Sequence, residues 1–215
     1  MKYKLLCLAL CLLLIFSCLP AQAAFNNFYL RTRYGQLVSY ENFPYCYAID
    51  VYSGFYMYSD DQLNALWENY DNNDDDDDEI YDFRYWISPD RTYEFLIQVK
   101  EQTYASFEEE IAHAPYFIDN MMDDLRAAGF EDIRQLHPGI LRDTPEGQML
   151  ETAYSVGYVK DGASTQITVV YYDCYFEDIE YIFEVTAYNG DYETAQYLLD
   201  QMVQTLDITY PEGNR

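Results

Sequence analysis

Apolar and aromatic residues alternate with polar residues along much of this chain, and this alternation constrains the fold more than any other feature. Successive side chains of a strand point to opposite faces, so a period of two is typical of a strand with one buried face. Within residues 45–52, for example, Tyr47, Ile49 and Val51 share one face. The pattern predicts short strands near 36–40 and 133–136 and main strands at 45–52, 83–87, 93–99, 150–159, 165–175 and 181–188.

Short turn sequences separate several of these strands, which favours antiparallel neighbours. Ser88-Pro89-Asp90 and Lys160-Asp161-Gly162 each join two consecutive strands, as does the segment 177–180. Antiparallel neighbours need only a tight turn, whereas parallel neighbours need a long crossover. The stretch Val169–Tyr172 is apolar on both faces, which predicts a central strand that is covered on both sides.

Three segments have helical periodicity. Two of them open with a capping box, at Ser59–Gln62 and at Ser106–Glu109, and the third spans residues 189–206. Pro115 lies inside the second helix and is expected to kink or split it, and Gly129 ends it. Strands and helices together predict one α+β domain, a central antiparallel β-sheet flanked by helices in an α/β/α sandwich.

The order of elements from Gln36 to Ile208 resembles the PsbP-like fold of the photosystem II extrinsic protein, a Ran-release factor and small exported bacterial proteins of unknown function. The resemblance rests on Ile49-Asp50-Val51 before Ser53-Gly54-Phe55, the Phe95–Val99 strand before the Ser106 helix, Leu125–Phe130, Gly147-Gln148, the Tyr181 hairpin and the Tyr197–Leu206 helix. It implies an α/β/α sandwich that binds partners without catalysis and shares no active-site residues. The acidic insert departs from the family pattern, as does the lack of a proline near residue 52.

The N-terminus has the features of an export signal. Lys2 and Lys4 precede the apolar run 5–16, and Ala21-Gln22-Ala23 provides the small residues of a cleavage site. We therefore expect a signal peptide at residues 1–23 and a secreted protein, either extracellular or at the cell envelope. A lipoprotein anchored at Cys18 is the alternative, because Ile15-Phe16-Ser17-Cys18 partly matches a lipidation sequence.

The remaining chain is expected to form an N-terminal arm at 24–43 and a single domain at 44–210, with an acidic insert at 68–82. No second apolar run approaches the ~20 residues that a membrane-spanning helix needs. The net charge of −26 repels nucleic acid and anionic lipid and attracts cations and basic surfaces. We therefore expect no nucleic-acid partner and no membrane span.

The insert contains a dense run of carboxylates, at Asp71, Asp74, Asp75, Asp76, Asp77, Asp78 and Glu79. Read as an EF-hand loop, the run has Asp76 where the sharp turn requires glycine, and Asp78 where an apolar residue is usual. Adjacent aspartates also repel one another. The run is therefore a solvated loop or a weak calcium-binding segment, and no dedicated metal site is expected.

Two cysteines, Cys46 and Cys174, lie beyond the expected signal. In an exported protein they are candidates for a disulfide bond, and two buried free thiols are the alternative.

The sequence contains 25 tyrosines, more than the core of one sheet can bury. Tyrosine suits half-exposed strands, but it also suits recognition surfaces. The candidate binding face is formed by Tyr56, Tyr58, Trp67 and Trp86 beside the insert.

Motifs for catalysis, phosphate binding or cofactor binding are lacking, and only His113 and His137 are available for proton transfer. We therefore expect no enzyme activity and no cofactor. The leading hypothesis is a secreted, non-catalytic binding or assembly module at the cell envelope, with a protein or an envelope polymer as its partner. The alternatives are a calcium-responsive structural protein that uses the insert and a hydrolase that uses acids such as Glu101 or Asp173.

Overall fold

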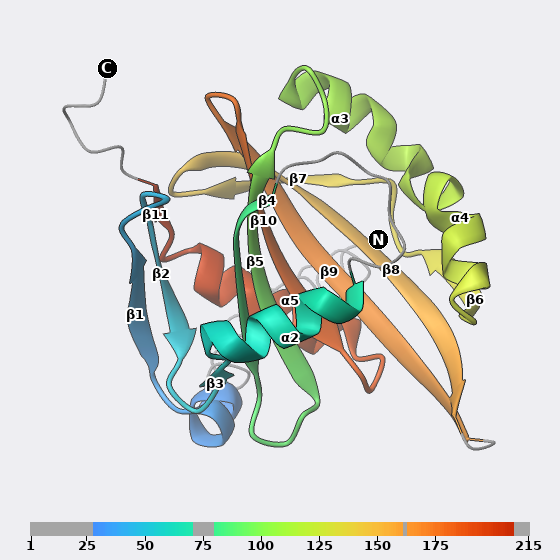
Figure 1. The fold of residues 1–215 in the computed structure, drawn as a ribbon, viewed down its shortest axis with the longest axis horizontal. Coiled ribbons are helices and arrows are strands. Elements are labelled where there is room, and N and C mark those ends of the chain that lie inside the picture. The colour runs from blue at the N-terminus through green and yellow to red at the C-terminus, as the bar shows by residue number, and fades with distance from the viewer. Residues whose placement is uncertain (1–27, 71–79, 161–162, 209–215) are drawn as a thin grey trace, which may run out of the picture.

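The computed structural model describes residues 28–70, 80–160 and 163–208 (Figure 1). The expected signal peptide, with Cys18, and the acidic run Asp71–Glu79 lie outside these residues. The main sheet is antiparallel and has eight strands. Its order is β3 (Tyr56–Met57), β4 (Ile80–Ile87), β5 (Tyr93–Glu101), β10 (Ile179–Ala187), β9 (Ala163–Phe176), β8 (Gly147–Lys160) and β6 (Glu131–Gln135), with β7 (Ile140–Thr144) also paired to β8.

A second, smaller sheet consists of β1 (Leu37–Asn42), β2 (Tyr47–Tyr52) and β11 (Asp207–Ile208). The strand predicted at 45–52 therefore does not join the main sheet. Its residues Tyr47, Ile49 and Val51 are buried in the same hydrophobic core as the main sheet and helix α5.

The helices begin and end largely where capping signals and proline predict. The bounds are α2 (Asp60–Tyr70), α3 (Phe107–His113), the 3₁₀ turn η1 (Ala114–Tyr116), α4 (Phe117–Ala127) and α5 (Tyr192–Val203). Both capping boxes form: Ser59 N donates to Gln62 Oε1 at 3.0 Å, and Glu109 N donates to Ser106 Oγ at 3.3 Å. Pro115 lies in η1, where the expected long helix is split into α3 and α4.

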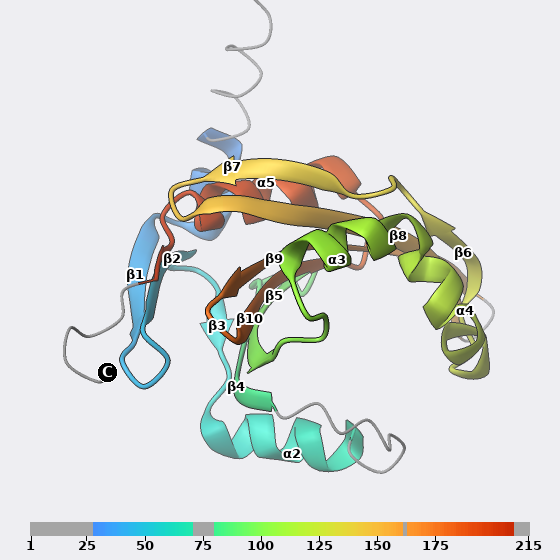
Figure 2. The same cartoon turned by 90° about the horizontal axis from the view of Figure 1, so that it is seen from above.

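The helices cover the two faces of the main sheet unequally (Figure 2). Helix α5 lies on one face, and α2, α3 and α4 lie on the other. The α5 face is a dry core in which the helix residues Ala195, Leu198, Leu199 and Met202 join the strand residues Phe95, Ile97, Val170, Phe183 and Val185. The predicted α+β class, with a central antiparallel sheet flanked by helices, is confirmed.

Strand β9 is central, as its apolar sequence predicts. It lies between β10 and β8, and all four residues of Val169–Tyr172 are buried. Strand β7 was not predicted, because it is a five-residue edge strand whose Leu141 is exposed and whose apolar pattern is too short to register.

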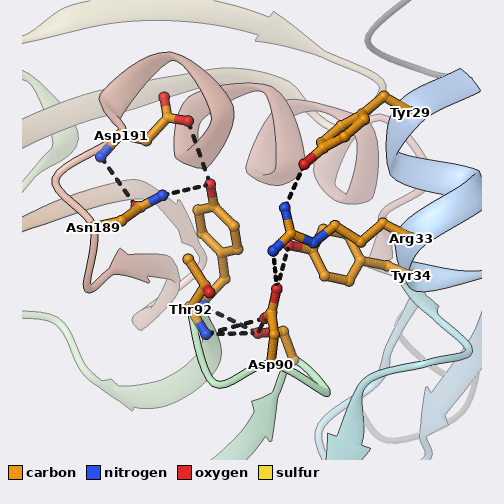
Figure 3. A network of polar contacts seen from close by, with 9 residues as sticks. Tyr29, Arg33, Tyr34, Asp90, Thr92, Asn189 and Asp191 are labelled. Carbon is orange, nitrogen blue, oxygen red and sulfur yellow. Dashed lines mark hydrogen bonds and ion pairs between the residues drawn. The ribbon is translucent and has the colours of Figure 1, made fainter.

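The segment expected to be an arm packs on the domain instead. Residues 28–34 are helical, and Leu30 and Tyr34 are buried in the core. Arg33 forms an ion pair with Asp90 in the β4–β5 turn, and Tyr34 OH donates to the same carboxylate at 3.4 Å (Figure 3). The boundary expected near residue 43 therefore does not separate this segment from the core.

The two cysteines are free thiols, which corrects the candidate disulfide. Cys46 has a positive φ of 58° in the turn between β1 and β2, and its Sγ lies 3.6 Å from the carbonyl oxygen of Phe43. Cys174 is buried within β9, and burial raises the pKa of its thiol. The turn conformation directs the Cys46 thiol back toward its own loop.

This arrangement predicts unequal reactivity of the two thiols. In the native protein an aromatic disulfide reagent should modify Cys46 within minutes and Cys174 only after denaturation, because the thiolate is the reactive form and burial suppresses it. The unfolding midpoint should be the same with and without a reducing agent. A lower midpoint under reducing conditions would show that the thiols are bridged.

Candidate functional site

The candidate site lies on the sheet face opposite α5, which we call the second face. Along each strand, residues on this face alternate with residues of the dry core. Those on this face include Leu96, Gln98, Asp173, Ile182 and Glu184. Helices α3 and α4 lie over one side of this face and α2 lies near the other, so its middle is less covered (Figure 2). Two adjoining hollows occupy this space.

The first hollow, the acid pocket, has a volume of about 360 Å³ and lies between α3–η1–α4 and strands β5, β8, β9 and β10. Three carboxylates define it: Glu110 from α3, Asp173 from β9 and Glu180 from β10. One oxygen atom from each lies within 4.8 Å of the others. All three side chains are buried, with exposed fractions of 7% for Glu110, 2% for Asp173 and 4% for Glu180.

Strand register and helix position bring these acids together. Asp173 pairs with Ile182, and Glu180 pairs with Tyr175 on one side and with Lys100 of β5 on the other. Glu110 joins them from α3, which lines the same pocket and ends before the break at Pro115.

Hydrogen bonding in the acid pocket is incomplete. Glu180 accepts a hydrogen bond from Thr103 N at 2.9 Å, and Lys100 Nζ lies 3.9 Å from the same oxygen. Glu110 Oε2 and Asp173 Oδ1 have no hydrogen-bond partner among the described residues. Buried polar atoms are normally paired, and an unpaired one costs roughly 1–3 kcal/mol. Arg84 Nε and His137 Nδ1 are also buried without a partner, but only the acid pocket brings two unpaired oxygens together among the described residues, where a ligand or a proton can satisfy both.

The protonation of the acids reflects this environment. Burial, followed by repulsion from Glu180, raises the pKa of Glu110 from 4.5 to about 7. Burial, together with the charges of Glu110 and Glu180, raises the pKa of Asp173 well above its usual range. The pocket therefore retains a proton near neutral pH unless a cation takes its place.

Aromatic residues form the walls of the acid pocket. The ring of Tyr104 stacks on His113 with 4.9 Å between centroids, and Phe117 packs against Tyr171 at 5.3 Å. Tyr104 N donates to Tyr175 OH at 3.2 Å. These rings keep the carboxylates in a low-dielectric environment, which strengthens their electrostatic interactions.

The second hollow, the central groove, has a volume of about 500 Å³ and lies between strand β4 and helix α4. Its lining is mainly apolar and includes Leu96, Leu125 and Tyr85. Two acids, Glu94 and Glu184, also line it; Glu94 accepts from Tyr188 OH at 2.7 Å and Glu184 from Thr186 Oγ1 at 2.8 Å. Burial raises the pKa of Glu184.

The predicted tyrosine and tryptophan face is only partly present. Tyr56 is 56% exposed, and its ring packs against Tyr58, which in turn packs against Tyr85 of the central groove with 4.7 Å between centroids. Trp86 is 4% exposed, so its inclusion in the binding face was wrong. It faces the core, packed between Tyr40 and Phe95. The side chain of Trp67 lies outside the described part of the chain.

The acid pocket was largely missed from the sequence. Asp173 was named as a candidate hydrolase acid, and it does lie in the pocket, whereas its companion Glu101 is exposed at the end of β5. Glu110 and Glu180 were not singled out. The available signal was the carboxylate of Asp173 within an otherwise apolar stretch of a central strand, where a charge needs a partner.

Another buried acid, Glu151 on β8, provides a contrast on the α5 face. It accepts hydrogen bonds from His137 Nε2 at 2.9 Å, Tyr192 OH at 2.8 Å and Gln196 Nε2 at 3.0 Å, and Arg142 forms an ion pair with it. Burial alone would raise the pKa of Glu151, but these donors lower it to about 2. This carboxylate is satisfied and holds α5 and β7 to β8.

Comparisons with solved structures give the fold family. Cyanobacterial PsbP (CyanoP) from Synechocystis sp. PCC 6803 matches with a TM-score of 0.53 and 11% sequence identity, covering 80% of this chain and 92% of that chain. The chain has a PsbP-like fold. The resemblance inferred from the order of elements is confirmed at the level of fold.

Two further solved structures match this chain with TM-scores below 0.5. The Ran-binding protein Mog1p of Saccharomyces cerevisiae has a TM-score of 0.47 and 11% identity, covering 80% of this chain and 95% of that chain. LpqN of Mycobacterium tuberculosis, involved in cell envelope biogenesis, has a TM-score of 0.45 and 10% identity, with coverages of 81% and 91%. No protein-family model matches the sequence, and no curated protein matches it.

The acid pocket predicts how stability depends on pH in the presence of a chelator. The pKa of Glu110 is higher in the folded state, so its contribution is fully present below pH 4.5 and is lost as the pH rises to about 7. Glu110→Gln should therefore raise the free energy of unfolding at pH 8 by roughly 1–3 kcal/mol and reduce its decline between pH 5 and 8. Urea unfolding at both pH values measures this.

Glu151→Gln is the matched control for this measurement. It places an amide among donors that require a carboxylate, so it should lower stability by roughly 3–5 kcal/mol without flattening the pH dependence between pH 5 and 8. Equal pH dependence in the wild type and in Glu110→Gln would contradict the assignment.

Proposed function

We propose that this protein is a non-catalytic binding module that acts outside the cytoplasm, at the cell envelope, and that its central groove receives a basic, partly apolar segment of a partner protein. The observation that carries the proposal is the central groove itself, a hollow of about 500 Å³ on a sheet face that the helices leave partly open.

The chemistry of the groove favours such a segment. Leu96, Leu125 and the ring of Tyr85 offer apolar and aromatic contact area, which is typical of the centre of a binding interface. Glu94 and Glu184 offer acceptors for lysine or arginine at its floor. Burial and the nearby charge of Glu94 raise the pKa of Glu184, and a basic side chain of the partner would stabilise its ionised form.

The overall charge supports the same class of partner. A net charge of −26 produces a long-range field that accelerates the approach of a basic partner and repels acidic ones. The central groove itself contributes Glu94 and Glu184 to this charge. Charge and apolar area therefore coincide on one surface.

The location proposed rests on the export features of the N-terminal sequence. Among the described residues, the structure contains no helix long and apolar enough to cross a membrane.

The placement of the histidines supports a binding function rather than catalysis. His137 is occupied by Glu151 on the α5 side of the sheet, and His113 stacks on Tyr104 while its Nδ1 lies 2.8 Å from the Glu109 carbonyl oxygen. Neither is placed as the base of a nucleophile among these contacts.

Site-specific photocrosslinking in cells that produce the protein tests this proposal. A photoreactive amino acid at Leu96, in the groove, should give one discrete adduct with a partner protein, whereas the same label at Leu141, exposed on edge strand β7, should not. The double variant Glu94→Gln, Glu184→Gln should reduce the adduct at least about tenfold, because losing one partner of a buried charge pair costs roughly 2–5 kcal/mol.

Identical adducts from positions 96 and 141 would contradict a partner site in the groove. An adduct at position 96 that is insensitive to the double variant would contradict the basic character of the partner.

A further inference from the structure

We propose that the acid pocket is a binding site for a hard divalent cation, with calcium as the ligand class, held by Glu110, Asp173 and Glu180. This inference goes beyond the proposed partner binding and does not depend on it, because it concerns a different hollow. It also differs from calcium binding by the acidic run, because none of these three acids lies in the insert.

Geometry is the first argument. Three carboxylate oxygens, one from each residue, lie within 4.8 Å of one another, a separation at which one ion can contact all three. Calcium takes six to eight oxygen ligands at about 2.3–2.6 Å. The pocket volume of about 360 Å³ leaves room for the water molecules that would complete this number.

The unpaired oxygens are the second, independent argument. Glu110 Oε2 and Asp173 Oδ1 are buried and accept no hydrogen bond from a donor group among the described residues, and both residues are more than nine-tenths buried. The two acids can hydrogen-bond to each other only when one of them is protonated. Ordinary acidic surface clusters are solvated by water and need no ion. Here the two oxygens are buried, so a cation held by the acids together with water in the pocket provides the missing interaction.

Charge is the third argument. When ionised, the three carboxylates carry three negative charges, and Lys100 near Glu180 carries one positive charge. Two negative charges remain, which one divalent ion neutralises. Lys100 Nζ lies 3.9 Å from Glu180 Oε2 and donates to Thr103 Oγ1 at 2.7 Å, and its charge also acts on Glu110 and Asp173.

The donor set selects the class of metal. Carboxylate and water oxygens are hard ligands that suit calcium, magnesium and manganese, whereas zinc and copper prefer imidazole and thiolate. His113 lines the pocket, but its ring is stacked on Tyr104 and its Nδ1 contacts the Glu109 carbonyl oxygen. Calcium accepts irregular oxygen coordination, whereas magnesium demands a near-ideal octahedron, and we therefore name calcium.

Cation binding competes with protons at this site. The titratable groups around the three acids are Lys100 from β5, Tyr154 from β8, Tyr171 and Tyr175 from β9, Glu184 from β10, Tyr104 from the loop before α3, and His113 from α3. Carboxylates must lose their protons before they bind a metal ion, so calcium and protons compete for the three acids. Affinity for calcium should therefore increase from pH 6 to pH 8.

Terbium luminescence and calorimetry test the proposal directly. Terbium replaces calcium and emits strongly when excited through nearby tyrosines, which the pocket supplies in Tyr104, Tyr171 and Tyr175. The experiment uses the full chain in which Asp74–Asp78 are changed to asparagine, so that the acidic run cannot provide the signal. This chain should show saturable terbium emission that calcium reverses, and calorimetry should give one calcium site per chain.

Variants then locate the site. In the same background, Glu110→Gln and Asp173→Asn should each weaken calcium binding at least about tenfold, since even outer-shell changes at metal sites cost roughly 10–100-fold. Glu108→Gln, an exposed acid on the same helix, should leave binding unchanged. Glu110→Gln is expected to be more stable than the parent at pH 8, so unfolding does not explain a loss of binding.

Three outcomes would overturn the proposal: no calcium binding in the parent chain, equal affinity of Glu110→Gln and Glu108→Gln, or binding of ethylammonium in place of calcium. The last would assign the pocket to an organic amine.

Discussion

The unequal covering of the two faces of the main sheet is the constraint on which the rest of this structure depends. Strands β5, β10, β9 and β8 each present alternate side chains to both faces, so every strand contributes to both environments. The α5 face is closed by an amphipathic helix and by the small sheet, and it holds the dry core. The second face is covered at its sides, and its middle remains hollow.

The buried carboxylates on the two faces differ in their hydrogen bonding and in their pKa values. On the α5 face Glu151 is surrounded by donors, and its pKa falls to about 2. On the second face Glu110 and Asp173 each retain an unpaired oxygen, and the pKa of each is raised. A carboxylate with full hydrogen bonding stabilises the fold, whereas an incompletely bonded cluster lowers stability and persists where it serves a function. The two buried carboxylate oxygens without a hydrogen-bond donor therefore lie where we place the ligand.

Local patterns in the sequence predicted most of the fold. Period-two alternation predicted the main strands, the serine capping boxes predicted the starts of α2 and α3, and Pro115 predicted the break between α3 and α4. Each of these signals is contained within about ten residues. The packing of residues 28–34 and the separate small sheet depend on contacts between distant segments, which a local pattern does not specify.

Strand β4 shows why the site was harder to predict. The apolar alternation of Phe83 and Tyr85 would assign these residues to the core, yet both line the central groove. The opposite side of the strand faces the core. There the buried Asp82 forms an ion pair with Arg84 at 2.9 Å and accepts a hydrogen bond from Asn42 at 2.7 Å. Asp82 can face the core rather than water because Asn42, which is distant in the sequence, donates a hydrogen bond to it.

The acid pocket was hard to predict for the same reason, because it depends on contacts between distant segments. Its three carboxylates are brought together by the register of β9 and β10 and by the position of α3 over the sheet. Only Asp173 gave a local signal, as a charge within an apolar strand.

The most direct measurement for this account is a crystal structure of the protein grown with manganese, with diffraction recorded at a wavelength where manganese scatters anomalously. The account predicts an anomalous difference peak between the carboxylates of Glu110, Asp173 and Glu180, with metal–oxygen distances of about 2.2 Å, close to those of other hard divalent ions. A map with density for the three acids and no anomalous peak among them would contradict it.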